Sequence, residues 1–458
     1  MQPGIRLKTK LGIGTATLAT LLAGVLAPAS SQVPGLPTQV VDLEVPTRIA
    51  RYKVTDFGRS PSARDDRTSR AKFRVVKNTG NCCENYLTSS TRGRIFDQGG
   101  KWINYTDDDG ATWKSVQPLV PLVNGEGTIS MGPKGDVLGV QWDPYSGDHL
   151  QAYKYDAASE EWTYLESPLH TPFYDRPWLS IVPGPFAVQG GEAPYVGFLD
   201  GYPHTGTLLY TTDGLTYTQA SSPYVDSQLE DPVESWIPTK KVPEMDLMQP
   251  NTNSPIIPLG GGRALAPPDA FGNDWSLLNP ETLRWAPFTL PGGEKLTGRY
   301  LVDGQGRLHN LIATGSTFEY RISTDGAKSW RSTKVTLPEG VAITGGLQLD
   351  FRANARAGVA AVSMHSRNGT KGTDLDLLYK IDISGNTPRL DRLYEIGLGD
   401  VDASSSGPPA DIRFDFNTVA ILPDGRIAVS FLDSTTDEAI HLAQGVVNRL
   451  GPAMAIEL

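Results

Sequence analysis

Cysteine is almost missing from this sequence. The two cysteines, Cys82 and Cys83, are adjacent, so no disulfide can close a long loop. A bridge between neighbours would be strained, because their Cα atoms lie about 3.8 Å apart whereas disulfides usually span roughly 4.4–6.8 Å. The surrounding residues provide no recognisable zinc-ligand spacing, so we interpret the pair as incidental thiols. The fold must therefore depend on a hydrophobic core.

Apolar runs long enough to cross a membrane are also missing. The apolar run at residues 11–27 is interrupted by three threonines and is shorter than the roughly 20 residues that a spanning helix needs. Three basic residues precede it, and Ala27-Pro28-Ala29 provides a small-x-small cleavage site. The pattern predicts a secretory signal peptide over residues 1–29. The mature chain is then secreted, whether extracellular, periplasmic or at the cell surface, with no integral membrane span.

Positive charge is scarce, and several catalytic motifs are missing. The chain has 41 Lys and Arg residues against 51 Asp and Glu residues, and loss of the leader takes the net charge from −10 to −13. An acidic body argues against nucleic acid as a partner. No G-x-S-x-G, H-E-x-x-H or G-x-x-x-x-G-K-[ST] motif is present, which argues against serine hydrolases, zinc proteases and P-loop enzymes. We expect no cofactor, no bound metal and a monomer.

Glycine and proline, in contrast, are abundant. They number 48 and 35, together about 18% of the chain, and this composition is typical of many turns between short strands. A repeated turn is the clearest pattern: Thr106–Trp113 (TDDDGATW), Ser323–Trp330 (STDGAKSW) and the shorter Thr211–Tyr217 (TTDGLTY). Looser copies end at Trp162 and Trp285. Intervals of about 45 to 68 residues predict a propeller or a similar array.

The chemistry of this turn explains its residues. We expect the Ser or Thr hydroxyl and the Asp carboxylate to accept backbone N–H bonds, while Gly supplies a positive φ. The aromatic residue is expected to start the next strand and to pack between neighbouring sheets. Residues 107–109 lack the alternating spacing of a calcium loop, so we interpret these Asp residues as structural.

Strand-like segments divide the chain into seven units. The units are expected to begin near Phe73, Thr128, Leu179, Ile256, Tyr300, Leu347 and Phe416. They predict an all-β protein, a β-propeller of seven four-stranded antiparallel blades, with six blades as the alternative. The propeller is expected over residues 70–458, with residues 30–69 as an N-terminal arm or ring-closing strands.

The repeats resemble those of the Asp-box, or BNR-repeat, superfamily, which includes sialidases. The resemblance covers most of residues 70–447. It implies a sialidase-like propeller that binds extracellular glycans or acts on them as a glycoside hydrolase. Sialidases use a Tyr nucleophile aided by Glu, an Asp acid/base and three Arg that hold the substrate carboxylate. Phe73-Arg74 corresponds to the family's opening motif, and Asp97 is the nearby candidate for the acid/base. The last tyrosine, Tyr394, adjoins Glu395, but adjacent strand residues point to opposite faces.

Propeller geometry selects the candidate site. The four strands of a blade run outward from the axis, so the connections from the second to the third strand, and from each blade to the next, share one face. Candidates in the former connections are Asp97, Asp143, Asp148, His149, Asp200, Tyr202, His204, His365, Arg367 and Asp433, with His170 on the same face. Candidates near the starts of inner strands are Arg74, Asp175, Arg176, Arg299, Arg352 and Arg413.

From this face we predict roles for ten residues. The catalytic carboxylates of a glycosidase would come from Asp97, Asp143, Asp200 and Asp433. The ligand-binding set is Arg74, Asp175, Arg176, His204, Arg352 and Arg413, in which Arg would clamp an anionic or polyhydroxylated ligand. Solvated loop residues and salt bridges between blades are the other interpretation of the same side chains.

An insertion rich in proline and acidic residues occupies residues 222–255. We expect it to leave the candidate-site face, where Trp236 and Tyr224 form a sugar-stacking platform or lid, or where one aromatic side chain anchors a long surface loop. Two functions remain open: a glycan-binding or glycan-hydrolysing propeller, and a non-catalytic propeller for adhesion or protein scaffolding.

Overall fold

The computed structural model describes strands and turns within the unit Thr38–Leu458. The described residues are 41–45, 48–49, 52–59, 73–77, 86–90, 92–99, 102–117, 126–143, 149–170, 175–188, 191–202, 208–220, 241–250, 252, 254, 256–266, 275–288, 298–343, 349–368, 373–398, 418–432, 438–442, 445–449 and 452–458. The predicted signal peptide and the two cysteines lie outside these residues.

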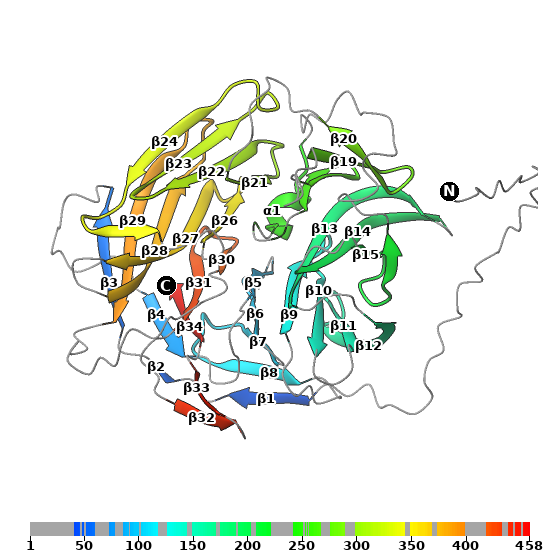
Figure 1. Ribbon diagram of the computed structural model, residues 1–458, viewed down its shortest axis with the longest axis horizontal. Coiled ribbons are helices and arrows are strands. Elements are labelled where there is room, and N and C mark those ends of the chain that lie inside the picture. Colours follow the sequence, from blue (N-terminus) through cyan, green and yellow to red (C-terminus); the bar gives the residue numbers. More distant parts are fainter. Residues whose placement is uncertain are drawn as a thin grey trace, which may run out of the picture. The chain divides into compact units, whose positions relative to one another are not determined.

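The unit is an all-β, seven-bladed propeller, as predicted, and each blade contains four antiparallel strands (Figure 1). Blade 1 contains β5 (Tyr86–Ser89), β6 (Ile95–Gly99), β7 (Trp102–Thr106) and β8 (Trp113–Gln117); blade 2 contains β9 (Glu126–Met131), β10 (Val137–Asp143), β11 (His149–Asp156) and β12 (Glu161–His170); blade 3 contains β13 (Asp175–Val188), β14 (Gly191–Tyr202), β15 (Leu208–Thr211) and β16 (Thr218–Ala220); blade 4 contains β17 (Ile257–Gly260), β18 (Arg263–Ala266), β19 (Trp275–Asn279) and β20 (Arg284–Phe288).

The remaining three blades complete the propeller. Blade 5 contains β21 (Arg299–Val302), β22 (Leu308–Thr314), β23 (Thr317–Ser323) and β24 (Arg331–Thr336); blade 6 contains β26 (Leu349–Asn354), β27 (Val359–Asn368), β28 (Thr373–Asp382) and β29 (Arg389–Leu398); blade 7 contains β30 (Thr418–Ile421), β31 (Ile427–Leu432), β34 (Pro452–Glu457) and β4 (Phe73–Lys77). In addition, β25 (Val341–Ile343) pairs with β27, and β32 (Glu438–Leu442) pairs with β33 (Gly445–Arg449).

The inner strands form a closed cycle. Contacts run from β5 to β9, β13, β17, β21, β26, β30 and back to β5. Burial follows the position in the blade: the inner strand β26 is buried along its whole length, whereas the outer strand β24 is mostly exposed. The hydrophobic core therefore lies between blades and toward the axis.

Closure of the ring corrects one prediction. The first unit was expected to begin near Phe73, but Phe73–Lys77 is β4, the fourth strand of blade 7, and it pairs with the C-terminal strand β34. The inner strand of blade 1 begins at Tyr86 instead. A short apolar strand has the same local pattern in either place, so only the long-range pairing distinguishes them.

Three strands of the N-terminal segment extend successive blades. β1 (Val41–Val45) pairs with β8 of blade 1, β2 (Arg48–Ile49) with β4 of blade 7, and β3 (Tyr52–Gly58) with β29 of blade 6. The segment thus runs along the outer edges of three neighbouring blades, where it covers strand edges that would otherwise expose unpaired backbone groups.

The repeated turns join the third strand of a blade to the fourth. In the first turn, Thr106 Oγ1 accepts the Gly110 N–H at 2.9 Å and Asp108 Oδ1 accepts the Thr112 N–H at 2.8 Å. Asp213 and Asp325 accept backbone N–H bonds in the corresponding turns. The hydroxyl and carboxylate groups therefore have the predicted structural role.

In two of the repeated turns, the buried aromatic residue packs against another blade. Trp113 is buried in a cluster with Val76 and Ile456 of blade 7. Tyr217 is buried in a cluster with Leu138 and Val140 of blade 2. The repeated pattern thus connects a turn within one sheet to the hydrophobic contact between two sheets.

None of the helices in the described part of the chain has the length and hydrophobicity to cross a bilayer.

Candidate functional site

A segment of the insertion passes through the centre of the propeller. Its helix, α1 (Glu244–Met248), contacts the inner strands β9, β13 and β26, and Figure 1 shows it inside the ring of blades. Val242 N–H donates to the Gly304 carbonyl in the β21–β22 turn, whereas the Arg299 guanidinium, at the start of β21, donates to the Thr252 carbonyl. The segment therefore runs along the axis of the propeller. It starts at the end that carries the turns between first and second strands and reaches the opposite end, where the inner strands begin.

Gln249 fastens this central segment to blades 1 and 7. Its side-chain Nε2 donates to the Ile421 carbonyl at 2.7 Å, and its Oε1 accepts the Ile421 N–H at 2.7 Å. The same Nε2 donates to Ser89 Oγ at 3.1 Å. Gln249 itself adopts a left-handed conformation, with φ of 44°, at the C-terminus of α1.

Thr252 makes the corresponding contacts with blade 6. Its hydroxyl donates to Asp350 Oδ1 at 2.6 Å and accepts the Phe351 N–H at 3.2 Å. Burial lowers the pKa of Arg299 to about 10, although the nearby Asp350 carboxylate favours the charged guanidinium. Hydrogen bonds thus satisfy the polar groups that the segment brings into the interior.

A cavity of about 360 Å³ lies beside α1, at the end of the ring that carries the first-to-second-strand turns. Its polar lining comes from Ser89, Ser90, Glu244, Asp246, Gln249, Asn354 and Arg356, and its apolar lining from Pro133, Pro243, Leu247, Ile421 and Pro423. The residues derive from α1 and from blades 1, 2, 6 and 7. This end is opposite to the face on which the sequence predicted a site.

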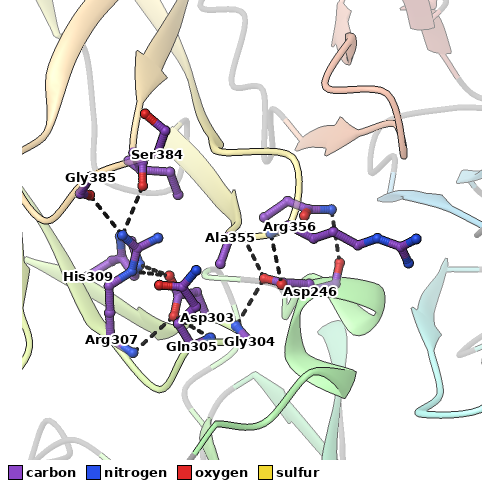
Figure 2. A network of polar contacts seen from close by, with 12 residues as sticks. Asp246, Asp303, Gly304, Gln305, Arg307, His309, Ala355, Arg356, Ser384 and Gly385 are labelled. Atoms are coloured by element: carbon purple, nitrogen blue, oxygen red, sulfur yellow. Dashed lines mark hydrogen bonds and ion pairs between the residues drawn. The ribbon is translucent and has the colours of Figure 1, made fainter.

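Asp246 holds α1 in place beside the cavity. Its Oδ1 accepts the N–H groups of Gly304 at 2.9 Å and Ala355 at 2.6 Å, and its Oδ2 accepts the Arg356 N–H at 3.0 Å (Figure 2). Burial raises the pKa of the Asp246 carboxyl group, although the Gly304 and Ala355 N–H groups favour the carboxylate. A Cβ atom at Gly304 would overlap this carboxylate, so the close approach requires glycine.

A second polar network lies in blade 5, on the other side of Gly304 (Figure 2). Asp303 Oδ2 contacts His309 Nε2 at 2.9 Å and accepts from Arg307 Nε at 2.7 Å, while His309 Nδ1 contacts the Tyr320 hydroxyl at 2.8 Å. Arg307 also donates to the carbonyls of Ile383 and Gly385 in blade 6. These side chains are buried, so the network connects two blades and does not face the cavity.

Two of the predicted catalytic carboxylates lie within strands rather than in the connections between them. Asp97 lies within β6, opposite Leu87 and Asn104, and is fully buried. Asp200 lies within β14, is 2% exposed, and its Oδ1 accepts the Gly201 N–H at 2.8 Å. Both were expected in connections between the second and third strands of a blade, but each lies within the second strand itself.

Two predicted ligand-binding arginines are engaged within the protein. Arg74 lies on β4, the fourth strand of blade 7, rather than near an inner-strand start, and it donates to the carbonyls of Asp108 and Asp109 at 2.8 and 2.9 Å. Arg352 is 3% exposed and donates to Asp350 Oδ2 at 3.2 Å and to the carbonyls of Val419 and Gln249. These arginines lie in different parts of the propeller and form no common ligand cup.

Several candidates can be placed only by their backbone. Asp143, Asp175 and Arg176 lie at strand ends, as do His149, His170, Tyr202, His365 and Arg367, but their side chains are outside the described part of the structure. Asp148, His204, Arg413 and Asp433, together with Tyr224 and Trp236 of the insertion, lie wholly outside it. The roles assigned to all of them remain predictions.

Tyr394, the tyrosine next to Glu395, is engaged with another carboxylate. It is 2% exposed on β29, the fourth strand of blade 6, and its hydroxyl contacts Glu457 Oε1 at 3.4 Å rather than Glu395. Burial raises the pKa of Tyr394, which disfavours the phenolate.

The residues that line the cavity were missed by reasoning from the sequence. The stretch PEMDLMQPN within the insertion has paired methionines, Met245 and Met248, which are buried, and that apolar spacing was the available signal. The acidic and proline-rich composition around it suggested a surface loop instead. The described residues of this stretch, 241–250, 252 and 254, correct that expectation for their part of the insertion.

No family model and no curated protein sequence matches this chain. Among solved structures, a protein of unknown function from Dyadobacter fermentans aligns at 11% identity over 92% of this chain and 100% of that chain, with a TM-score of 0.33. A gluconolactonase from Xanthomonas campestris aligns at 9% identity over 79% and 99%, with a TM-score of 0.28. The NanB sialidase from Streptococcus pneumoniae aligns at 11% identity over 88% and 61%, with a TM-score of 0.21. Likenesses this low carry no functional argument.

Proposed function

We propose that this protein is an exported β-propeller that binds extracellular carbohydrate at the cavity beside α1. The volume of about 360 Å³ lies in the range of small-molecule sites, roughly 300–1,000 Å³. The observation that carries the proposal is the lining, which combines hydroxyl, amide, carboxylate and guanidinium groups around a few apolar residues. Sugar hydroxyls both donate and accept, and this mixture matches them.

The lining retains hydrogen-bonding capacity for a ligand. Ser90 Oγ accepts the N–H groups of Arg92 and Arg94, which leaves its own hydrogen available as a donor. Glu244 and Arg356 are exposed at the cavity and supply an acceptor and a donor. The framework behind them is fixed, because Gln249 and Asp246 are already bonded to blades 1, 5, 6 and 7.

Binding rather than hydrolysis is proposed. Of the predicted catalytic residues with described side chains, Asp97 and Asp200 are both buried within strands. Asp246, which does line the cavity, accepts three backbone N–H bonds and serves to anchor α1. A general acid must reach the glycosidic oxygen. Asp97 and Asp200 are buried, and Asp246 is occupied by backbone N–H groups, so these carboxylates do not supply that acid.

The binding test uses the purified chain on a glycan array, followed by calorimetric titration of the glycans that bind. Pro423→Trp places a large side chain at the exposed rim of the cavity, and Thr387→Trp is the matched control in an exposed turn of blade 6 that does not line it. We expect at least a roughly tenfold loss of affinity in the first variant and none in the second.

Two results would contradict the proposal. An empty glycan array together with recovery of a protein partner would favour the adhesion or scaffolding function. Glycan binding that survives Pro423→Trp would move the site away from α1.

Export is tested separately: with the leader intact, the protein recovered outside the membrane should begin near Ser30, and retention of residues 1–29 would contradict cleavage.

A further inference from the structure

Two opposite charges line the cavity without forming an ion pair. Glu244 and Arg356 are both exposed, and within the described residues neither side chain makes a hydrogen bond or salt bridge. The N–H groups around Asp246, by contrast, occupy its carboxylate. Among the residues that the structure describes, the cavity therefore presents one carboxylate and one guanidinium without a partner.

The backbone fixes where these two charges begin. Glu244 opens α1, and Arg356 lies in the β26–β27 turn. Asp246, two residues after Glu244, accepts the Arg356 N–H at 3.0 Å, so a single carboxylate ties the helix to that turn. Figure 2 shows the Arg356 side chain extending away from His309, on the side of Asp246 opposite the blade 5 network.

We infer that the cavity selects a zwitterionic carbohydrate, a sugar that carries both a carboxylate and an ammonium group. The inference rests on the proposed carbohydrate-binding function and adds the class of sugar. Arg356 would bind the carboxylate through two parallel N–H···O bonds, which its planar guanidinium allows. Glu244 would accept from the ammonium group. A neutral sugar leaves both charges to water, and a purely anionic sugar meets Glu244 and gains from only one of them.

The test is a titration with four sugars that share one ring. Muramic acid carries an ammonium and a carboxylate, N-acetylmuramic acid only the carboxylate, glucosamine only the ammonium, and N-acetylglucosamine neither. At low ionic strength we expect muramic acid to bind roughly tenfold more tightly than either singly charged sugar, because each charge-assisted contact contributes on that order.

Two charge-removing variants assign each contact. Arg356→Gln should remove the preference for a carboxylate and keep the preference for an ammonium group, and Glu244→Gln should do the reverse. Both side chains are exposed and the Arg356 N–H bond to Asp246 is retained, so folding is preserved. Arg331→Gln, an exposed arginine on β24 outside the cavity, is the control and should change neither preference.

The outcomes separate this inference from the proposed function. Equal affinities for the four sugars, with glycan binding still blocked by Pro423→Trp, would overturn the zwitterion inference and leave carbohydrate binding intact. A preference for muramic acid that survives both substitutions would also overturn it. Failure of every sugar, here and on the array, would overturn both.

Discussion

The side-chain amide of Gln249 bonds both backbone groups of Ile421, with each of the two distances at 2.7 Å. Gln249 follows α1 at the centre of the propeller, and Ile421 ends the inner strand of blade 7. One amide thus joins the central segment to the blade that closes the ring. That blade combines N-terminal and C-terminal strands, so the contact joins the central segment to the sheet that closes the ring.

Gln249→Ala should lower the free energy of unfolding by about 1–3 kcal/mol, because the Ile421 N–H is left buried without an acceptor. Chemical denaturation measures the change. Gln219→Ala, at an exposed position on β16, is the matched control and should stay within about 0.5 kcal/mol of the parent protein. Equal effects of the two substitutions would show that the hydrogen bonds between Gln249 and Ile421 do not stabilise the fold.

The blade 5 network predicts a dependence of stability on pH. Burial favours the neutral form of Asp303, but His309 and Arg307 outweigh it and lower the pKa to about 2 from the ordinary 3.8. A depressed pKa stabilises the fold above the unfolded value, and this contribution is lost as the pH falls from about 4 through about 2. It corresponds to about 2 kcal/mol at neutral pH.

Asp303→Asn should therefore destabilise the protein by at least about 2 kcal/mol at pH 7, and the difference should shrink as the pH approaches 2. Denaturation at several pH values measures this. Glu319→Gln, on the neighbouring strand β23, replaces a carboxylate that makes no hydrogen bond or ion pair within the described residues, and a smaller loss is expected. A constant difference between Asp303→Asn and the parent from pH 7 to 2 would contradict the assignment.

Equivalent positions in two of the repeated turns should respond differently to substitution. Gly110 has a φ of +77°, and a Cβ atom there would lie 2.8 Å from Ile456 Cδ1, so Gly110→Ala should cost about 1–3 kcal/mol. Ala327 holds a φ of 69° in the blade 5 turn, so Ala327→Gly relieves strain and should change stability by less than about 1 kcal/mol. Thermal unfolding of both variants checks the pair. A larger loss for Ala327→Gly than for Gly110→Ala would be incompatible with this account.

Arg352 should behave as a structural residue. Arg352→Met removes the ion pair between Arg352 and the fully buried Asp350, so we expect a loss of about 3–5 kcal/mol in the free energy of unfolding. Arg331→Met, at an exposed position on β24, should stay within about 0.5 kcal/mol. Unchanged stability combined with weaker carbohydrate binding would instead support the ligand-binding role that the sequence suggested.

Much of the architecture could be predicted from local sequence patterns. The hydroxyl, Asp, Gly and aromatic residues of the turns act within eight positions of one another, so their chemistry can be recognised without knowing the fold. Six of the seven units were placed within about five residues of the inner strands that the structure has. The exception is Phe73, which pairs with a strand about 380 residues away in sequence.

The residues of the candidate site could not be predicted in the same way. Asp97, Asp200 and Arg352 were selected because they were expected on the propeller face where connections from several blades converge, but all three are buried. Asp246 and Arg356, which do meet at the cavity, are 110 positions apart and carry no shared motif.

The sequence by itself determined the repeated turns, the strand pattern and hence the ring of blades, because these follow from interactions between residues close together in the chain. Only the tertiary structure decided which strand closes the ring, what fills the axis and where a cavity forms. Those outcomes depend on hydrogen bonds and burial between segments distant in sequence, and such contacts leave no periodic signal in the order of residues.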